Sequence, residues 1–198
     1  LESSVLTCCS AFDWFLRSFY PECSPSDYGV INQEVSDAKG SPVIALPYFQ
    51  GRATPDWNSR AEASFHHVSL SASRGDFARA ILEGICHEIN VNLSIIRGYT
   101  GEIRSVRICG GLTKNPIFAQ LEADILREPV SLFSNEEATA LGAWIQGAMA
   151  LGLFADYASA FQASRAGDTS RVYTPDEDTR NFYQKKQEDF EALYRKLY

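Results

Sequence analysis

Apolar side chains recur every three or four residues in several stretches of the chain, and this spacing predicts helices. The longest stretch begins after Ser73, which forms the weaker version of a capping box with Asp76, and Gly98 is expected to end it. Six apolar residues define one face of this predicted helix: Phe77, Ile81, Ile85, Ile89, Leu93 and Ile96. A helix with one continuous apolar face is expected to run along the core.

Five further helices are predicted from the same spacing and from the signals at their ends. Pro116 occupies the first turn of one of them, where its missing N–H group costs nothing. Capping boxes at 134–137 and 174–177 precede the last two helices. The expected helices are at 8–20, 28–38, 115–128, 138–151 and, after the second capping box, up to residue 197.

Short apolar or alternating runs lie between these helices and are typical of strands. They are found at 1–7, 43–49, 65–68, 103–109 and 130–133. Strands that alternate with helices indicate the α/β class, and 198 residues suit one domain with a substantial core. We therefore expect a mixed sheet flanked by helices.

Charge and composition exclude several classes of function. The chain has 25 Asp and Glu residues against 18 Lys and Arg, which gives a net charge of −7 and argues against coating nucleic acid or docking on an anionic membrane. No apolar run approaches the ~18 residues of a membrane span. The five cysteines form no C-x-x-C pair, so we expect reduced thiols, no zinc site and a cytoplasmic protein.

The strongest local signal for ligand binding is a strand followed by a Gly110–Gly111 bend and a helix that starts near Asn115. Two glycines at the carboxyl end of a strand let the backbone approach a ligand without Cβ atoms in the way. The helix start presents unpaired N–H groups and the positive end of the helix dipole, and open α/β sheets bind ligands at that edge. The pattern matches neither standard phosphate fingerprint, so it is also typical of a tight turn without a ligand.

No residue pattern identifies a catalytic base or a metal site. The chain has no G-x-S-x-G motif, and no pair of carboxylates is placed face to face by its spacing. His66 and His67 are expected on opposite faces of a strand, and His87 on a helix, so they do not suggest a shared metal. The loop at 51–58 is either an interface or polar-contact segment or an ordinary surface loop anchored by Trp57.

Several stretches, in the same order, resemble the C-terminal half of the FGGY carbohydrate kinases, the group that includes glycerol kinase, xylulokinase, ribulokinase and gluconokinase. The resemblance extends over essentially the whole chain, but the matching residues do not indicate which sugar or polyol is the substrate. The stretches that carry it are 1–14 (LESSVLTCCSAFDW), 46–55 (LPYFQGRATP), 79–85 (RAILEGI), 109–116 (CGGLTKNP) and 136–143 (EEATALGA).

The resemblance implies the actin-like, ribonuclease H-like ATPase fold, with residues 1–198 as its second, nucleotide-binding lobe. The residues that it places against ATP are Gly110, Gly111, Leu112 and Asn115. It sets the glycine backbone beside the ribose and α-phosphate, and the asparagine near the adenine.

Two further contacts are implied by the first of these stretches. Cys9 and Asp13 stand where glycerol kinases use a glycine and a glutamine to contact the nucleotide. Because Asp13 is acidic, it would serve the adenine or the ribose and not a phosphate.

The resemblance assigns the catalytic aspartate and most of the sugar pocket to the other lobe, and Mg²⁺ and the transferred phosphoryl group to the cleft between the lobes. The chain begins with Leu1 and not Met, so we expect an excised domain whose partners are its own N-terminal lobe, ATP and a sugar or polyol, and which is inactive alone. A homodimer is also compatible with the sequence. The alternatives are a non-catalytic actin-like nucleotide-binding or regulatory module, and an α/β interaction domain with no ligand.

The predicted helix at 138–151 is rich in alanine and glycine. Such small residues are expected to let this helix pack closely, so that the sheet and the nucleotide loop approach each other. On that interpretation, Gly142→Leu overpacks the contact and costs ~1–3 kcal/mol.

Overall fold

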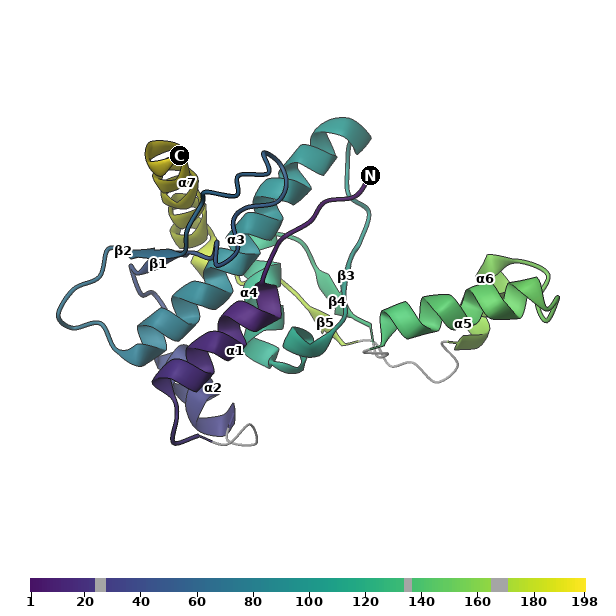
Figure 1. Ribbon diagram of the computed structural model, residues 1–198, viewed down its shortest axis with the longest axis horizontal. Coiled ribbons are helices and arrows are strands. Elements are labelled where there is room, and N and C mark those ends of the chain that lie inside the picture. Colours follow the sequence, from purple (N-terminus) through teal and green to yellow (C-terminus); the bar gives the residue numbers. More distant parts are fainter. Residues whose placement is uncertain (24–27, 134–136, 165–170) are drawn as a thin grey trace.

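The computed structural model describes residues 1–23, 28–133, 137–164 and 171–198, which Figure 1 shows as helices and strands. The helices are α1 (Cys8–Phe19), α2 (Tyr28–Asp37), α3 (Arg74–Thr100), α4 (Pro116–Leu126), α5 (Ala138–Ala150), α6 (Tyr157–Ser164) and α7 (Arg180–Leu197), with short 3-10 turns at Gly111–Lys114 and Glu177–Thr179. The strands are β1 (Ile44–Leu46), β2 (Ser64–His66), β3 (Val106–Ile108), β4 (Val130–Leu132) and β5 (Val172–Tyr173). The predicted helices and four of the predicted strands are confirmed.

Helix α3 forms the centre of the molecule, because α1, α2, α4 and β1 all pack against it (Figure 1). Its predicted capping box is present: Ser73 accepts from the Asp76 N–H group, and the Asp76 carboxylate accepts from the Ser73 N–H group. Gly84 allows β1 to approach closely, since a Cβ there would lie 2.4 Å from the Ala45 carbonyl oxygen. The helix continues past Gly98, the predicted stop, and ends at Gly101, whose φ of 76° favours glycine.

Two small sheets accompany this helix. Strands β1 and β2 pair antiparallel, whereas β4 lies between β3, which it pairs in parallel, and β5, which it pairs antiparallel. The second sheet is therefore mixed, as predicted. Val130 of β4 and Tyr173 of β5 pack against the small side chains of α4, which fixes the distance between that helix and the sheet.

The first seven residues do not form the predicted strand. Ser4 instead exchanges hydrogen bonds with Thr54: the Thr54 N–H group donates to the Ser4 carbonyl oxygen over 3.2 Å, and the Ser4 N–H group donates to Thr54 Oγ1 over 2.9 Å. Ser3 Oγ donates to Asn92 Oδ1 on α3 over 2.7 Å. The Thr54 hydroxyl therefore pairs with backbone of Ser4 that a strand would use for hydrogen bonds to a neighbouring strand.

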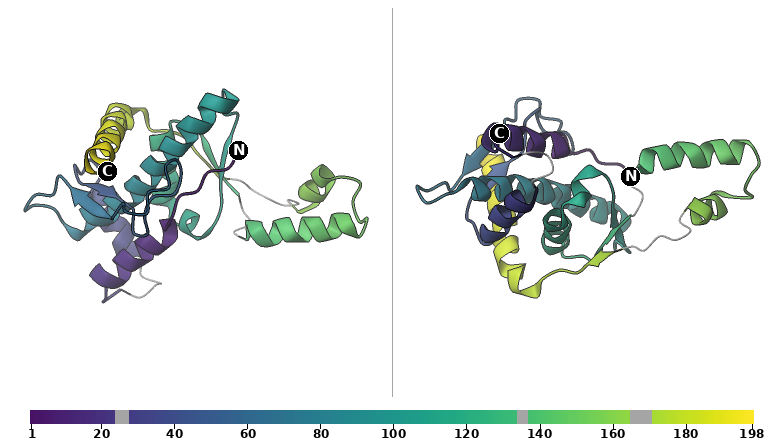
Figure 2. Two further views of the ribbon diagram at one scale, coloured as in Figure 1. Left: turned by 45° about the horizontal axis from the view of Figure 1, so that its top comes forward. Right: turned by 90° about the horizontal axis from the view of Figure 1, so that it is seen from below.

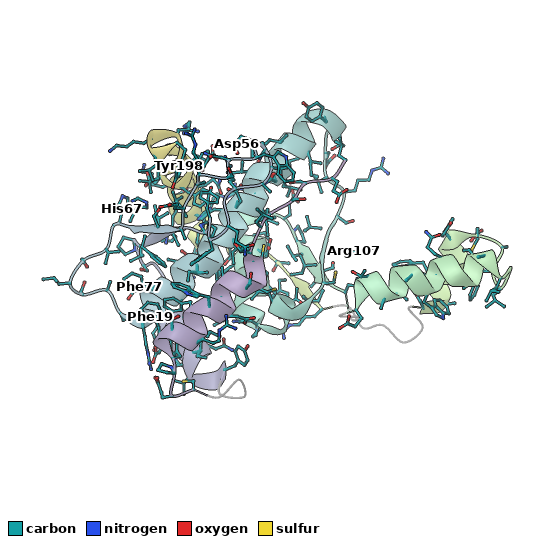
Figure 3. All side chains as sticks on the ribbon, in the orientation of Figure 1. Phe19, Asp56, His67, Phe77, Arg107 and Tyr198 are labelled. Carbon is teal, nitrogen blue, oxygen red and sulfur yellow. The ribbon has the colours of Figure 1, made fainter. Side chains whose placement is uncertain are left out.

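The loop at 51–58 is held by Arg52 and not by Trp57, which is 67% exposed. Arg52 is buried, its Nε donates to Glu88 Oε1 on α3 over 2.7 Å, and its guanidinium lies 4.0 Å from the centre of the Tyr194 ring. Glu88 also accepts from the Tyr48 hydroxyl. The loop is therefore fastened to α3 and α7 by a paired, buried charge. Figure 3 labels Asp56 of this loop near Tyr198, at the end of the chain.

A second buried charge network joins α3 to α7. Glu83 accepts from Arg79 Nε over 2.7 Å, from Lys186 Nζ over 2.6 Å and from the Tyr183 hydroxyl over 3.0 Å. Helix α7 itself begins at Arg180, after a 3-10 turn that is capped by Asp176. The expected capping box at 174–177 is thus wrong in its first residue, because Asp176 and not Thr174 supplies the capping oxygen.

Helices α5 and α6 pack on each other and extend away from the rest of the molecule (Figure 2). Within α5 only Ala148 is buried, and a Cβ on Gly142 would meet no atom within 4 Å. The expectation that this helix packs closely in the core, and that Gly142→Leu overpacks it, is therefore wrong. Its expected capping box involves residues 134–136, which lie outside the described residues. Among the described helices, none combines the length and apolar character needed to cross a membrane.

Candidate functional site: a cavity beside the Gly110–Gly111 bend

A cavity of about 350 Å³ lies between α1, α2 and the turn that follows β3. It contains five of the six residues that the sequence analysis placed at a nucleotide: Cys9, Asp13, Gly111, Leu112 and Asn115. A second hollow of about 540 Å³ continues along α1 and shares Asp13 and Tyr28 with the first. Residues from distant parts of the sequence therefore line one continuous groove.

The sixth predicted residue, Gly110, acts through the backbone. It does not line the cavity, but its φ of 103° and ψ of 176° turn the chain from β3 into the 3-10 turn that begins at Gly111. The Gly110 carbonyl oxygen accepts from the Thr113 N–H group and from Thr113 Oγ1, which closes the turn. This bend is what presents Gly111 and Leu112 to the cavity.

Asn115 has two different roles at its two side-chain atoms. Its Oδ1 accepts from the Ile117 N–H group over 2.9 Å, so it caps α4, with Pro116 in the first turn as predicted. Its Nδ2 is buried and has no hydrogen-bond partner. Because the cap fixes the orientation of the amide, Nδ2 is a buried donor of fixed orientation in a residue that lines the cavity. The N–H groups at the start of this helix were expected to be unpaired. This is wrong for Ile117, whose N–H group donates to Asn115 Oδ1.

Cys9 and Asp13 are one turn apart on α1, so both lie on the face that borders the cavity. Both side chains are exposed, and within the described residues Asp13 has no ion-pair partner. The neighbouring Cys8 differs, because burial raises the pKa of its thiol to about 11. Two adjacent thiols thus have very different surroundings.

Three cavity residues were missed by sequence reasoning: Phe12, Tyr28 and Asn32. Phe12 is in the predicted first helix, where the family resemblance implied only Cys9 and Asp13 as nucleotide contacts. Tyr28 and Asn32 are one turn apart on α2, and Asn32 Oδ1 is buried without a hydrogen-bond partner. The spacing of these two residues is a weak signal, because only the packing of α1 and α2 on α3 brings them to the same cavity as Cys9 and Asp13.

The other titratable groups do not form a second site. Burial lowers the pKa of His87 to about 4, and its ring contacts Gln187 and Phe190 of α7. His66 ends β2, while His67 has a φ of 57° beyond that strand. In the described ranges, no group of three or more His, Cys, Asp or Glu side chains is arranged to hold a metal ion.

The sequence profile described as "FGGY family of carbohydrate kinases, C-terminal domain" matches residues 1–151. The chain belongs to the FGGY family of carbohydrate kinases. The match ends at the end of α5, so the Gly110–Gly111 bend, α1 and α2 are all within the family domain.

Known proteins of this family extend the match along the chain. A xylulose kinase of Staphylococcus epidermidis is 28% identical over 186 residues, which are 93% of this chain and 37% of the relative. The crystal structure of a glycerol kinase of Plasmodium falciparum with ADP superposes with a TM-score of 0.78 at 27% identity, over 99% of this chain and 38% of that one. The structure of a xylulose kinase from Rhodospirillum rubrum gives a TM-score of 0.77 at 26% identity, over 95% and 38% of the two chains.

These likenesses confirm the predicted fold class, an α/β lobe of the actin-like, ribonuclease H-like type. They also give its extent, because the chain spans little more than a third of the length of the relatives that it matches.

Proposed function

We propose that this chain is the nucleotide-binding lobe of a carbohydrate kinase that transfers the γ-phosphate of ATP to a hydroxyl group of a sugar or polyol. The observation that carries the proposal is the cavity beside the Gly110–Gly111 bend, which is lined by Asn115, a residue whose buried amide donor Nδ2 has no partner. Membership of the family and similarity to a glycerol kinase solved with ADP support it. They favour a kinase lobe over a non-catalytic actin-like module.

The chemistry of the cavity wall suits an adenine base. Adenine offers ring nitrogens that accept hydrogen bonds and an amino group that donates them. Asn115 Nδ2 would donate to a ring nitrogen, and Asn32 Oδ1 would accept from the amino group. Because an unpaired buried polar group costs ~1–3 kcal/mol, a ligand that pairs both atoms gains affinity. The rings of Phe12 and Tyr28 give the base apolar and aromatic surroundings.

The remaining residues would orient the rest of the nucleotide. The backbone at Gly110 and Gly111 would lie along the ribose and the α-phosphate, with Leu112 against the nucleoside. Asp13 would accept from a ribose hydroxyl or the base, and Cys9 would border the same face of α1. ATP, bound with Mg²⁺, supplies the phosphoryl group, and this lobe contributes by holding the nucleotide in one position, since phosphoryl transfer depends mainly on positioning and charge stabilisation.

We propose that the catalytic base, most of the sugar pocket and the Mg²⁺ site involve the N-terminal lobe of the relatives, because this chain spans only 37% of such a protein. The 198-residue chain alone is therefore expected to give only background turnover with a sugar or polyol and MgATP in a coupled assay for ADP. Sustained turnover by the purified chain would contradict this division of labour.

Nucleotide binding is tested directly by calorimetric titration of the chain with ATP and ADP up to millimolar concentration. Asn115→Asp is the informative variant, because it keeps the oxygen that caps α4 and replaces the unpaired donor by a carboxylate oxygen that does not donate when ionised. We expect its unfolding midpoint to stay near that of the parent chain and its affinity for ATP to fall by about tenfold, the equivalent of one hydrogen bond.

Asn115→Ala is the matched comparison, since it removes both the cap and the donor. It is expected to lose affinity to a similar extent and, in addition, about 1 kcal/mol of folding stability. Absence of ATP binding at millimolar concentration, or an unchanged affinity in Asn115→Asp, would refute the proposed site.

A further inference from the structure

We propose that Cys9 is a site of reversible thiol modification, at which a mixed disulfide with a low-molecular-weight disulfide closes the nucleotide cavity. This inference rests on the proposed function, because it assigns a regulatory chemistry to the same site. Cys9 is exposed and lines the cavity of about 350 Å³. A group attached to its sulfur would therefore occupy space that the nucleotide needs.

The neighbouring thiol shows why the chemistry selects Cys9. Cys8 is half-buried, its Sγ lies 3.7 Å from the Val5 carbonyl oxygen, and burial raises the pKa of its thiol to about 11. The thiolate is the species that attacks a disulfide, so Cys8 reacts slowly at neutral pH and Cys9 has the accessible sulfur.

A second, independent observation indicates that the same cavity takes a polar ligand. Asn115 is 7% exposed and lines the cavity opposite α1, and its Nδ2 has no hydrogen-bond partner. Cys9 and the residue that bears the unpaired amide therefore line one cavity.

The covalent step is a thiol–disulfide exchange. The Cys9 thiolate attacks one sulfur of the small disulfide, a new S–S bond forms at Cys9, and the original S–S bond breaks. Cys9 is oxidised, and the second half of the small disulfide is reduced and leaves as a thiolate. A thiol reductant reverses the reaction by the same exchange, so the modification is a switch and not damage.

Cys109 provides a matched control within the chain. It is also exposed, and it directly precedes Gly110, but it does not line the cavity. Modification at Cys109 is therefore expected to leave the nucleotide cavity open, although the residue is only two positions from Gly111.

The test treats the full 198-residue chain with oxidised glutathione, locates the adducts by peptide mass spectrometry and measures ATP affinity by calorimetry before and after treatment. We expect an adduct at Cys9, a loss of ATP affinity of about tenfold or more, and full recovery with dithiothreitol. Prior saturation with ATP is expected to slow the adduct at Cys9 and not the adduct at Cys109.

Two variants complete the design, each compared with itself before and after treatment. Cys9→Ser is expected to show no loss of affinity on treatment, whereas Cys109→Ser loses affinity as the parent chain does. The inference is overturned if the Cys9 adduct binds ATP as tightly as the untreated chain, if only Cys109 is modified, or if treated Cys9→Ser loses affinity equally. An untreated chain that binds no ATP refutes the proposed function as well; binding that is indifferent to the Cys9 adduct refutes this inference alone.

Discussion

Helices α3 and α5 have opposite compositions and opposite surroundings. Helix α3 carries charged residues that are buried, among them Arg79, Glu83 and Glu88, and it lies at the centre of the molecule. Helix α5 has no charged residue, yet Ala148 is its one buried side chain. The apolar helix is thus on the outside and the charged one inside.

The difference shows that charged side chains can be buried where oppositely charged partners surround them, and that an apolar composition alone does not bury a helix. Each buried charge of α3 has an opposite charge within hydrogen-bond distance: Glu83 has Arg79 and Lys186, and Glu88 has Arg52. Helix α5 packs mainly on α6, and a ring contact between Phe133 and Phe161 joins α6 to the end of β4. Three predictions separate these two situations, from the largest expected effect to the smallest.

The largest effect is expected from Glu83→Ala, which leaves Arg79 and Lys186 buried without their carboxylate. Removing one partner of a buried ion pair costs ~3–5 kcal/mol, so the free energy of unfolding in urea should fall by that amount. Asp189→Ala is the control, because it removes the exposed pair with Lys185 on α7, and its effect should be far smaller. Equal effects of the two variants would show that burial does not strengthen the network.

The next effect concerns Glu122 of α4, whose buried Oε2 has no hydrogen-bond partner. Burial raises the pKa of this carboxyl from 4.5 to about 8, so the acid is neutral in the folded protein at neutral pH. A raised folded-state pKa gives stability that is complete below pH 4.5 and is lost as the pH rises towards 8. Glu122→Gln should abolish this slope and increase the free energy of unfolding by roughly 4 kcal/mol at pH 8.

Urea unfolding at pH 5 and pH 8 checks this prediction, with Glu102→Gln at an exposed position as the control. If the parent chain and Glu122→Gln show the same difference in stability between the two pH values, ionisation of the buried Glu122 carboxyl does not contribute to the pH dependence of stability.

The smallest effect contrasts one glycine in each helix. Gly84→Ala places a Cβ 2.4 Å from the Ala45 carbonyl oxygen, a backbone atom that cannot move aside, and should cost ~1–3 kcal/mol. Gly142→Ala meets nothing within 4 Å and should stabilise α5 by ~0.5–1 kcal/mol through helix propensity. Unfolding midpoints that move in opposite directions confirm the contrast, and a destabilising Gly142→Ala would indicate that α5 is packed after all.

Local chemistry explains which parts of the fold could be predicted. The Asn115–Pro116 pair predicts a helix start, and the structure shows both the proline in the first turn and the asparagine as the cap. The Ser73 capping box is equally local. The predicted stop at Gly98 is wrong because a glycine within a helix costs only about 1 kcal/mol, which a long helix tolerates. Gly101 ends the helix instead, since it adopts a positive φ and its N–H group donates to the Arg97 carbonyl oxygen.

Tertiary contacts explain what could not be predicted. The sequence predicts the helix at 28–38, but it does not show that Tyr28 and Asn32 line a cavity together with residues of α1. Likewise, no spacing within 51–58 indicates that Arg52 pairs with a carboxylate 36 residues away. The family resemblance predicts that Cys9 and Asp13 contact a nucleotide; both line the cavity, and the contact itself stays a prediction.

The bend at Gly110 leaves room for a side chain and yet disfavours one. A Cβ there would meet no atom within 4 Å, whereas the φ of 103° lies where residues of L configuration are strained. The restriction is one of handedness and not of size, so a D-alanine introduced at this position by chemical ligation would satisfy the backbone that L-alanine strains. The bend beside the cavity is therefore constrained by chirality, and an amino acid that the genetic code does not supply would test how much substitution it tolerates.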